Sequence, residues 1–304
     1  MGRKYRVLVL HSAPIPSGPY HAALRARLAT HGFVEGKNLV LDAPVLTTAG
    51  FDYMRQELPR LLKQTPDAIV TFAQRITESA LAATRTTPLV FVWMDDPVKA
   101  RLVNNYSRPG GNASGVTNRF SEVAGKRLEV LRELAPAIRR VAIVGPTYQP
   151  EGEAAMATIR PAANALGFEV MEVGAYASQL TLEIQRAIRN GAEAVLPLHI
   201  FSTLGYRDLG EEVARLCAKH RIATVFAESE MVEAGGLISY GTNLLEDVRR
   251  AADILATILR GINPGEIPID QASQFELAVN LRTARQLKIR VPPTVLARAT
   301  RVIQ

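Results

Sequence analysis

Short apolar runs of strand length alternate with amphipathic stretches of helical length along most of the chain. The first part of the sequence carries four such runs, at residues 6–12, 38–46, 67–73 and 89–94. Continuous runs rich in β-branched residues are typical of strands buried on both faces of a parallel sheet. The intervening stretch HAALRARLATHG has leucines four residues apart and a glycine where a helix would stop. The pattern therefore predicts βαβ units.

The same alternation starts again at residue 139. Further apolar runs follow at residues 139–146, 168–175, 192–201, 223–229 and 235–243. Two βαβ series in tandem predict an α/β fold with two Rossmann-like lobes and parallel sheets. The remaining helix and strand are too short for a third domain, so we expect them to return to both lobes across a hinge with several crossings. The expected lobes are 1–117 plus about 245–272, and 118–244 plus about 273–304.

Composition and charge narrow the class of protein. The chain of 304 residues is long enough for two domains, and it is 47% hydrophobic and 21% charged, as globular proteins are. A net charge of +7 would suit a nucleic-acid partner, but the basic residues are scattered and are not interleaved with aromatic residues. We therefore expect no nucleic acid. The single cysteine, Cys217, excludes a disulfide within the chain.

No apolar stretch is long enough to cross a membrane. The chain runs from MGRKY directly into a strand, without an apolar leader. This start indicates either a cytosolic protein or a mature form from which a leader has been removed.

The candidate site comes from the ends of the predicted strands, because ligands of open α/β sheets bind beyond the carboxyl ends of the strands. The candidate ligand-binding residues are Ser12, Ala13, Gln74, Arg75, Trp93, Tyr148, His199, Phe201, Glu228, Ser239 and Tyr240. Ser12, Gln74 and Arg75, together with a helix N-terminus, are expected to bind a carboxylate.

The other candidates would contact the body of the ligand. Aromatic side chains would line an apolar or aromatic group: Trp93, Tyr148, Phe201 and Tyr240. Trp93 fits a core position equally well. His199 and Glu228 are candidate polar selectors. Glu228 and Glu230 lie on a predicted strand, so their side chains are expected to point to opposite faces.

Signatures of catalysis and of cofactor binding are missing. The sequence has no GxGxxG after its first strand, no phosphate-binding loop and no GxSxG. His199 with Glu228 is the one pair that would serve an acid–base enzyme. Asp95 and Asp96 precede Pro97, where an acidic residue organises a turn more often than it binds a metal. We therefore expect no catalytic residue, cofactor or metal.

Several stretches in order resemble a known family. They are HGFVEGKNLVLD, DDPVKARLV, SRPGGNASGVTN, GKRLEVLRELAP, EMVEAGGLISYGTN and the segment 258–303. The chain resembles the ABC-transporter substrate-binding proteins of the tryptophan/tyrosine-type family, which have the type I periplasmic-binding fold. The resemblance implies a periplasmic or lipid-anchored receptor that delivers a ligand, often an aromatic amino acid, to a membrane permease.

One departure from the family bears on the ligand. Relatives often carry an acidic residue near the positions of Leu198 and His199, where it would hold an ammonium group. Losing such a charge-assisted hydrogen bond costs about 1.5–3 kcal/mol. Either Glu228 substitutes for that acid, or the ligand is an aromatic or aliphatic acid without an amine.

The resulting hypothesis is a non-enzymatic solute-binding receptor of an ABC importer. It would capture a small organic acid or amino acid with an aromatic or apolar body in a cleft between the lobes, by hinge closure. Two alternatives stay open at this point: a two-lobed enzyme such as a racemase or epimerase, and a cytosolic ligand-sensing regulator.

Overall fold

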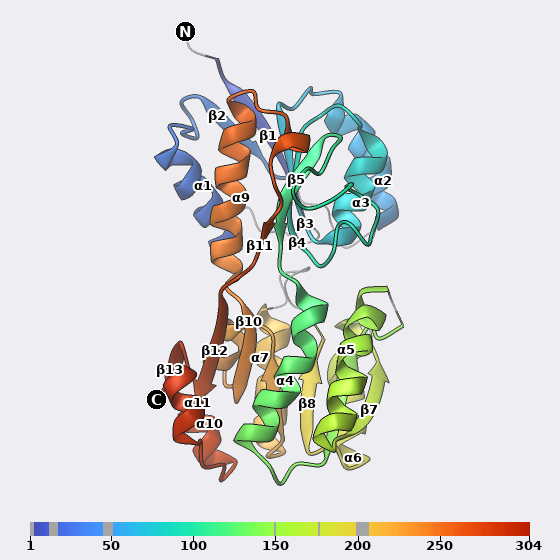
Figure 1. Ribbon diagram of the computed structural model, residues 1–304, viewed down its shortest axis with the longest axis vertical. Coiled ribbons are helices and arrows are strands. Elements are labelled where there is room, and N and C mark those ends of the chain that lie inside the picture. The colour runs from blue at the N-terminus through green and yellow to red at the C-terminus, as the bar shows by residue number, and fades with distance from the viewer. Residues whose placement is uncertain (1–2, 12–17, 45–50, 149, 176, 199–206) are drawn as a thin grey trace. The chain divides into compact units, whose positions relative to one another are not determined.

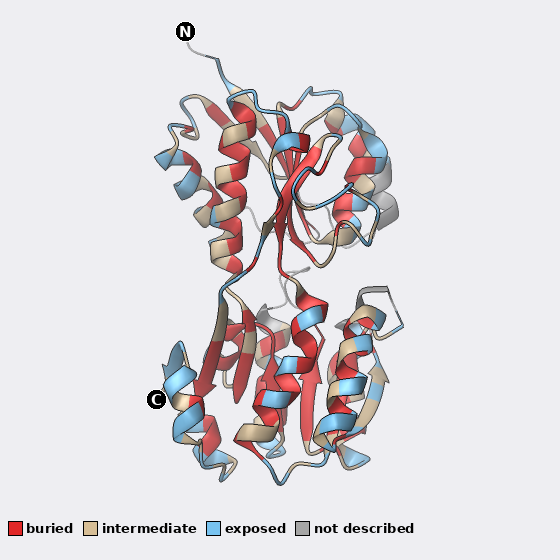
Figure 2. Cartoon of the chain, in the orientation of Figure 1, coloured by how far each residue is buried: buried red, intermediate tan, exposed pale blue. Residues whose placement is uncertain are grey.

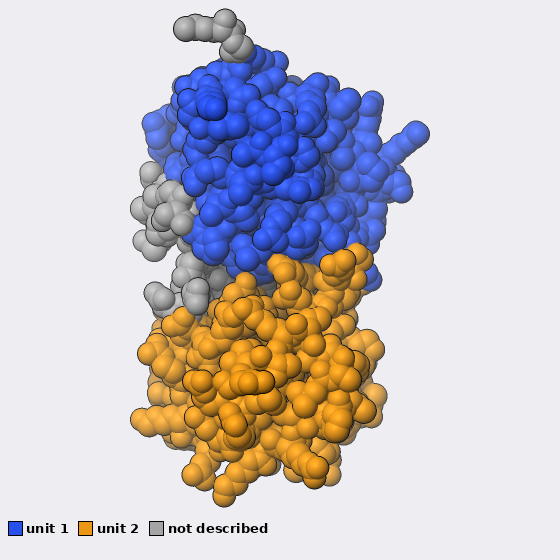
Figure 3. Space-filling model, turned by 90° about the vertical axis from the view of Figure 1, so that its left-hand side faces the viewer, with its two compact units in different colours: residues 1–119, 203–205, 244–272 blue, residues 120–202, 206–243, 273–304 orange. Residues whose placement is uncertain are grey.

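The computed structural model describes residues 3–11, 18–44, 51–148, 150–175, 177–198 and 207–304. The described residues form two compact units, coloured separately in Figure 3. Unit 1 contains the residues up to Arg119 and Leu244–Ala272, and unit 2 contains the described residues of 120–243 and Ser273–Gln304. Each unit has its own sheet and its own hydrophobic clusters.

Unit 1 is a doubly wound sheet of parallel strands (Figure 1). Its elements are β1 (Tyr5–Leu10), α1 (Pro19–Thr30), β2 (Leu39–Asp42), α2 (Phe51–Leu62), β3 (Ala68–Phe72), α3 (Gln74–Ala83), β4 (Leu89–Met94), β5 (Ala113–Thr117), α9 (Leu244–Leu259), a 3-10 turn (Pro264–Glu266) and β11 (Asp270–Gln271). The strand order is β11-β5-β4-β3-β1-β2, and every neighbouring pair is parallel. The order reverses between β1 and β3, which is the position where doubly wound sheets bind ligands.

Both faces of this sheet are covered, which explains the unbroken apolar runs in the sequence. One cluster joins Val7 and Val9 to Leu24 on α1 and Val248 on α9. A second cluster joins Leu8 and other alternate residues to α2 and α3 on the opposite face. β3, β4 and β5 are buried along their whole length (Figure 2).

Unit 2 has the same five-strand core as unit 1 and two further strands at the edge where unit 1 has β11. Its elements are α4 (Phe120–Leu134), β6 (Arg140–Gly145), α5 (Pro150–Leu166), β7 (Glu169–Gly174), a 3-10 turn (Ala177–Gln179), α6 (Leu180–Arg189), β8 (Ala194–Pro197), α7 (Arg207–Lys219), β9 (Ala223–Phe226), α8 (Ser229–Glu233), β10 (Ile238–Thr242), β12 (Phe275–Asn280), α10 (Leu281–Gln286), α11 (Pro293–Arg298) and β13 (Arg301–Ile303). The order is β13-β12-β10-β9-β8-β6-β7, with β10 and β12 antiparallel.

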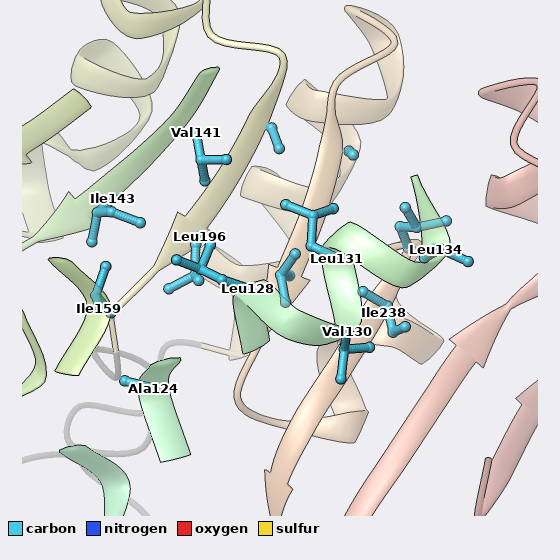
Figure 4. Packing of buried hydrophobic residues seen from close by; sticks show 14 of the residues in the cluster. Ala124, Leu128, Val130, Leu131, Leu134, Val141, Ile143, Ile159, Leu196 and Ile238 are labelled. Atoms are coloured by element: carbon cyan, nitrogen blue, oxygen red, sulfur yellow. The ribbon is translucent and has the colours of Figure 1, made fainter. Parts of the chain in front are cut away.

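The largest cluster of unit 2 lies between the sheet and helices α4 and α5 (Figure 4). Leu128 and Leu131 of α4 meet Ile143 and Leu196 of the strands in this cluster. Gly125 allows the two helices to approach closely, because a Cβ atom there would lie 3.0 Å from the carbonyl oxygen of Thr158. A second cluster with α6 and α7 covers the other face. The predicted α/β class with two mostly parallel sheets is confirmed.

Candidate functional site

The carboxyl edge of the unit 1 sheet carries two residues in strained backbone conformations. Ala73 (φ 77°, ψ 153°) connects β3 to α3 in a region normally limited to glycine. Trp93 (φ 61°) lies at an irregularity of β4, where the register with β5 shifts between Val92 and Met94. Strain of this kind persists only where surrounding structure holds it, and it is concentrated at binding sites.

Trp93 belongs to a cluster of aromatic rings at this edge. Its ring lies 4.8 Å from that of Tyr20, edge to face, and 5.0 Å from that of Phe72. Phe72 in turn contacts His11, which follows β1 directly. Trp93 is 6% exposed and belongs to a core cluster, so its ring packs mainly inside unit 1. Its role in ligand binding stays a prediction.

Three polar atoms near the carboxyl ends of β4 and β5 are buried without a hydrogen-bond partner among the described residues. They are Trp93 Nε1, Thr117 Oγ1 and Asn118 Oδ1. Buried polar groups in native proteins are almost always hydrogen-bonded, so unpaired ones mark a place where a ligand or water completes the bonding. The backbone N–H of Asn118 donates to the Met94 carbonyl and holds these two strand ends together. Thr117 and Asn118 were missed from the sequence, where they end a turn-rich segment.

A histidine pair lies beside the aromatic cluster. The Nε2 atoms of His11 and His21 are 3.0 Å apart, and both side chains are buried. Burial lowers the pKa of His21, and the nearby charge of Arg25 lowers it further. One ring therefore donates the shared proton and the other accepts it. The sequence showed His11 at a strand end, but ten residues between two histidines signal no contact.

Only some of the unit 1 residues that are predicted to bind a carboxylate lie in the described part of the chain. Gln74 and Arg75 form the first turn of α3, whose N-terminus has no side-chain cap. The Gln74 amide donates to Glu78 along the helix, and Arg75 is exposed. Ser12 and Ala13 lie outside the described residues.

In unit 2 the notable feature is a buried charge that the sequence did not reveal. Arg127 on α4 is 1% exposed, and burial lowers its pKa to about 10. Its Nε donates to the Tyr240 carbonyl oxygen (2.9 Å), and its guanidinium carbon lies 4.5 Å from the centre of the Phe120 ring. Nη1 has no partner in the part of the chain that the structure describes.

The predicted strand at 223–229 is shorter than expected, which corrects the placement of two glutamates. β9 ends at Phe226, and Glu228 is the N-cap residue of α8, which contains Glu230. They therefore do not alternate across a strand. Burial raises the pKa of Glu230, and Glu228, Glu276 and Glu233 raise it further. The sequence missed that proximity because the local strand prediction extended too far.

Glu276, on β12, adds a further carboxylate to the group formed by Glu228 and Glu230. Its carboxylate accepts hydrogen bonds from Ser229 Oγ (3.1 Å) and Asn243 Nδ2 (2.6 Å). The hydrogen bonds orient the carboxylate at the start of β12, opposite the end of β10. The carboxyl edge of unit 2 therefore brings together several charged side chains, of which Arg127 and Glu228 are buried.

The remaining predicted residues of unit 2 have different surroundings. Tyr240 stacks on Phe275 at 5.7 Å, and Tyr148 is 49% exposed. Ser239 is buried, and its Oγ has no hydrogen-bond partner among the described residues. His199 and Phe201 lie outside the described residues, so the acid–base pair of His199 and Glu228 stays untested.

No group of three or more potential metal ligands occurs in the described part of the chain. Asp96 caps a turn instead: its Oδ1 accepts from the N–H groups of Val98 and Lys99 and from the Tyr106 hydroxyl. Burial raises the pKa of the Cys217 thiol to about 12, which leaves it protonated and unreactive at neutral pH. None of the described helices is long and apolar enough to span a membrane.

Two doubly wound units, each built from separate segments of the chain, define a type I periplasmic-binding fold. The sequence model of the family "ABC transporter substrate binding protein" matches residues 24–303, and the chain belongs to this family. The predicted family and the predicted role as a substrate-binding protein are thereby confirmed. Members of this family work outside the cytoplasm and serve membrane transporters of small molecules.

Three similar proteins show the extent of the likeness. A protein named tyrosine-binding protein, from Clostridioides difficile (strain R20291), is 22% identical over 267 residues, covering 86% of this chain and 74% of its own. A conserved domain protein of Vibrio cholerae is 25% identical, with a TM-score of 0.87 over 99% of this chain and 100% of its own. A Streptococcus pneumonia ABC domain in complex with L-Trp is 19% identical, with a TM-score of 0.85 over the whole of both chains.

Proposed function

We propose that this protein captures an aromatic amino acid and delivers it to the permease of an ABC importer. The observation that carries the proposal is the group of buried, unpaired polar atoms of Trp93, Thr117 and Asn118 beside an aromatic cluster. Family membership supports the transport role, and the names of two relatives, with tyrosine and L-Trp, support the ligand class.

Unit 1 supplies the recognition of an aromatic body in this proposal. The partly exposed Tyr20 offers apolar surface, and the Trp93 indole N–H beside it is a donor without an acceptor among the described residues. Donors positioned in advance at an apolar site are what small-molecule sites use for orientation. Closure of the two units over the ligand stays a prediction from the sequence.

The protein acts as a receptor and not as an enzyme in this proposal, in the periplasm or anchored to the cell surface by a lipid. The racemase or epimerase alternative predicts inversion of a bound amino acid. Incubation with L-tryptophan and chiral chromatography would reveal it; recovery of unchanged L-tryptophan is expected, and turnover would contradict the receptor role.

The ligand class is tested by calorimetric titration with L-tryptophan, L-tyrosine and L-phenylalanine, with L-leucine and L-glutamate for comparison. A ligand present at 100 times its dissociation constant raises the free energy of unfolding by about 2.7 kcal/mol, so thermal unfolding detects the same binding. At least one aromatic amino acid should bind more tightly than both comparison ligands. Binding of L-leucine or L-glutamate alone would disprove the proposed class.

The role of the unpaired donor is tested by Trp93→Phe, which keeps an aromatic ring and removes the indole N–H. Affinity should fall about 10-fold, because Nε1 has no partner among the described residues and would donate to the ligand. The melting temperature should also fall, because the smaller ring leaves a cavity in the core cluster. Thr71→Val is the matched control: it breaks the internal Thr71–Thr77 hydrogen bond (2.8 Å) and should lower stability without changing affinity.

A further inference from the structure

The guanidinium of Arg127 reaches the carboxyl edge of the unit 2 sheet. Its side chain runs back along α4 to Phe120, the first residue of that helix. It also binds the carbonyl oxygen of Tyr240, two residues before β10 ends. α4 leads into β6, which runs in the same direction as β8 and β9, so the start of α4 lies at the carboxyl end of the sheet (Figure 1).

Arg127 is unusual because its charge is buried and its bonding is incomplete. Buried charges in proteins are normally paired and fully hydrogen-bonded. Nη1 has no partner among the described residues, although the whole side chain is only 1% exposed. The hydrogen bond from Nε and the contact with the Phe120 ring fix the plane of the guanidinium. An N–H donor of fixed direction and positive charge is suited to a carboxylate.

An acidic group stands beside this donor. Glu228 follows β9, the neighbour of β10 in the sheet, and is 4% exposed. It lies close enough to Arg127 for its charge to stabilise the guanidinium electrostatically. Glu230 and Glu276 extend the negative region. An amine-free acid would bring a further negative charge to this acidic edge, whereas a zwitterion brings one charge of each sign.

We infer that Arg127 and Glu228 bind the charged ends of an α-amino acid, Arg127 through Nη1 to the carboxylate and Glu228 to the ammonium group. The inference rests on the proposed function and deepens it, because it assigns the ligand's two charged groups to one unit. Glu228 then takes the role of the acid that is absent at Leu198 and His199, and a ligand without an amine is disfavoured.

The test is a calorimetric comparison of three ligands that differ in one charged group: L-tyrosine, 3-(4-hydroxyphenyl)propionate without the amine, and tyramine without the carboxylate. The wild-type protein should bind L-tyrosine about 10- to 100-fold more tightly than either analogue. Indole-3-propionate, tryptamine and L-tryptophan provide a second set of the same design.

Glu228→Gln is the decisive variant because it preserves shape and removes charge. It should weaken L-tyrosine about 10- to 100-fold and leave the propionate unchanged or tighter, so that the preference for the amine disappears. Arg127→Lys should weaken both carboxylate ligands and spare tyramine. Glu129→Gln on the exposed face of α4 is the matched control and should change nothing.

The outcomes separate the two claims. If wild-type protein binds L-tyrosine and Glu228→Gln keeps the full preference over the propionate, the inference is overturned while the proposed function stands. If neither ligand set binds in any of its members, the proposed function fails. Melting curves of each variant show whether a loss of binding reflects a loss of folding.

Discussion

Units 1 and 2 share one core topology but present different chemistry at the carboxyl edges of their sheets. The strand order β2-β1-β3-β4-β5 of unit 1 corresponds to β7-β6-β8-β9-β10 of unit 2. The edge of unit 1 carries aromatic rings, a hydrogen-bonded histidine pair and unpaired polar atoms of uncharged side chains. The edge of unit 2 carries a buried guanidinium and several carboxylates.

The difference shows that the doubly wound scaffold does not dictate what its edge binds. Parallel strands place their last residues along one edge in both units, and helices cover both faces. The chemistry then depends on single side chains, such as Trp93 in unit 1 and Arg127 in unit 2.

The largest effect is expected from emptying one core at a time. Leu24→Ala in unit 1 and Leu128→Ala in unit 2 remove fully buried side chains from separate clusters. Each should lower the free energy of unfolding by about 2–5 kcal/mol, because a cavity remains. Native-state hydrogen exchange should accelerate mainly in the unit that carries the substitution. Equal acceleration in both units would show that the two cores behave as one.

The second effect concerns the buried histidine His21 at the edge of unit 1. The pKa of His21 in the folded protein lies below the ordinary value of 6.5, so the unfolded chain binds the proton more readily. Stability is therefore full above about pH 6.5 and falls as the pH drops toward the folded-state pKa, with a limiting slope of about 1.4 kcal/mol per pH unit for one proton.

This dependence is measured by urea unfolding between pH 7 and pH 5 for the wild type, His21→Gln and His220→Gln. The wild type and the exposed His220 control should lose stability in parallel, and His21→Gln should lose less over the same range. Identical slopes for all three proteins would remove the histidine pair as the cause.

A smaller effect is expected from relieving the strain at the start of α3. Ala73→Gly should raise the free energy of unfolding by about 1 kcal/mol, because the strain of φ 77° is relieved and part of the gain is lost to the greater entropy of unfolded glycine. Ala83→Gly, at the exposed end of the same helix, should instead lower it by about 0.5–1 kcal/mol. A lower free energy of unfolding for both variants would show that the backbone at Ala73 is not strained.

The smallest effect concerns the interaction between the carboxylates of Glu276 and Glu230 in unit 2. Glu276→Gln removes one of the carboxylates that raise the pKa of Glu230, so that pKa should fall toward its ordinary value. The fall should be partial, because burial is the larger cause. Carboxyl-carbon NMR titration of Glu230 measures the change, and an unchanged midpoint would show that the acidic side chains do not interact.

Much of the fold was predictable from local patterns. Most strands of both units were found because runs such as 67–73 and 89–94 are apolar on both faces, and the family resemblance placed them in the type I fold. The short edge strands β11 and β13 were missed. The predicted strand 223–229 was too long. β9 ends at Phe226 and the N-cap of α8 follows at Glu228, so no turn-rich segment in the sequence marks the end of the strand. Glu228 was identified as a candidate binding residue, but its proximity to Arg127 was not.

By itself, the sequence determined the alternation of strands and helices, the two α/β units and the family, because each depends on residue spacing or on ordered motifs. The tertiary structure alone decided which side chains meet. Arg127 and Tyr240 are 113 residues apart, and nothing in either segment signals that a charged residue of an amphipathic helix is buried against that carbonyl. The strain at Ala73 and the pairing of His11 with His21 likewise arise only when strand ends are brought to one edge of a sheet.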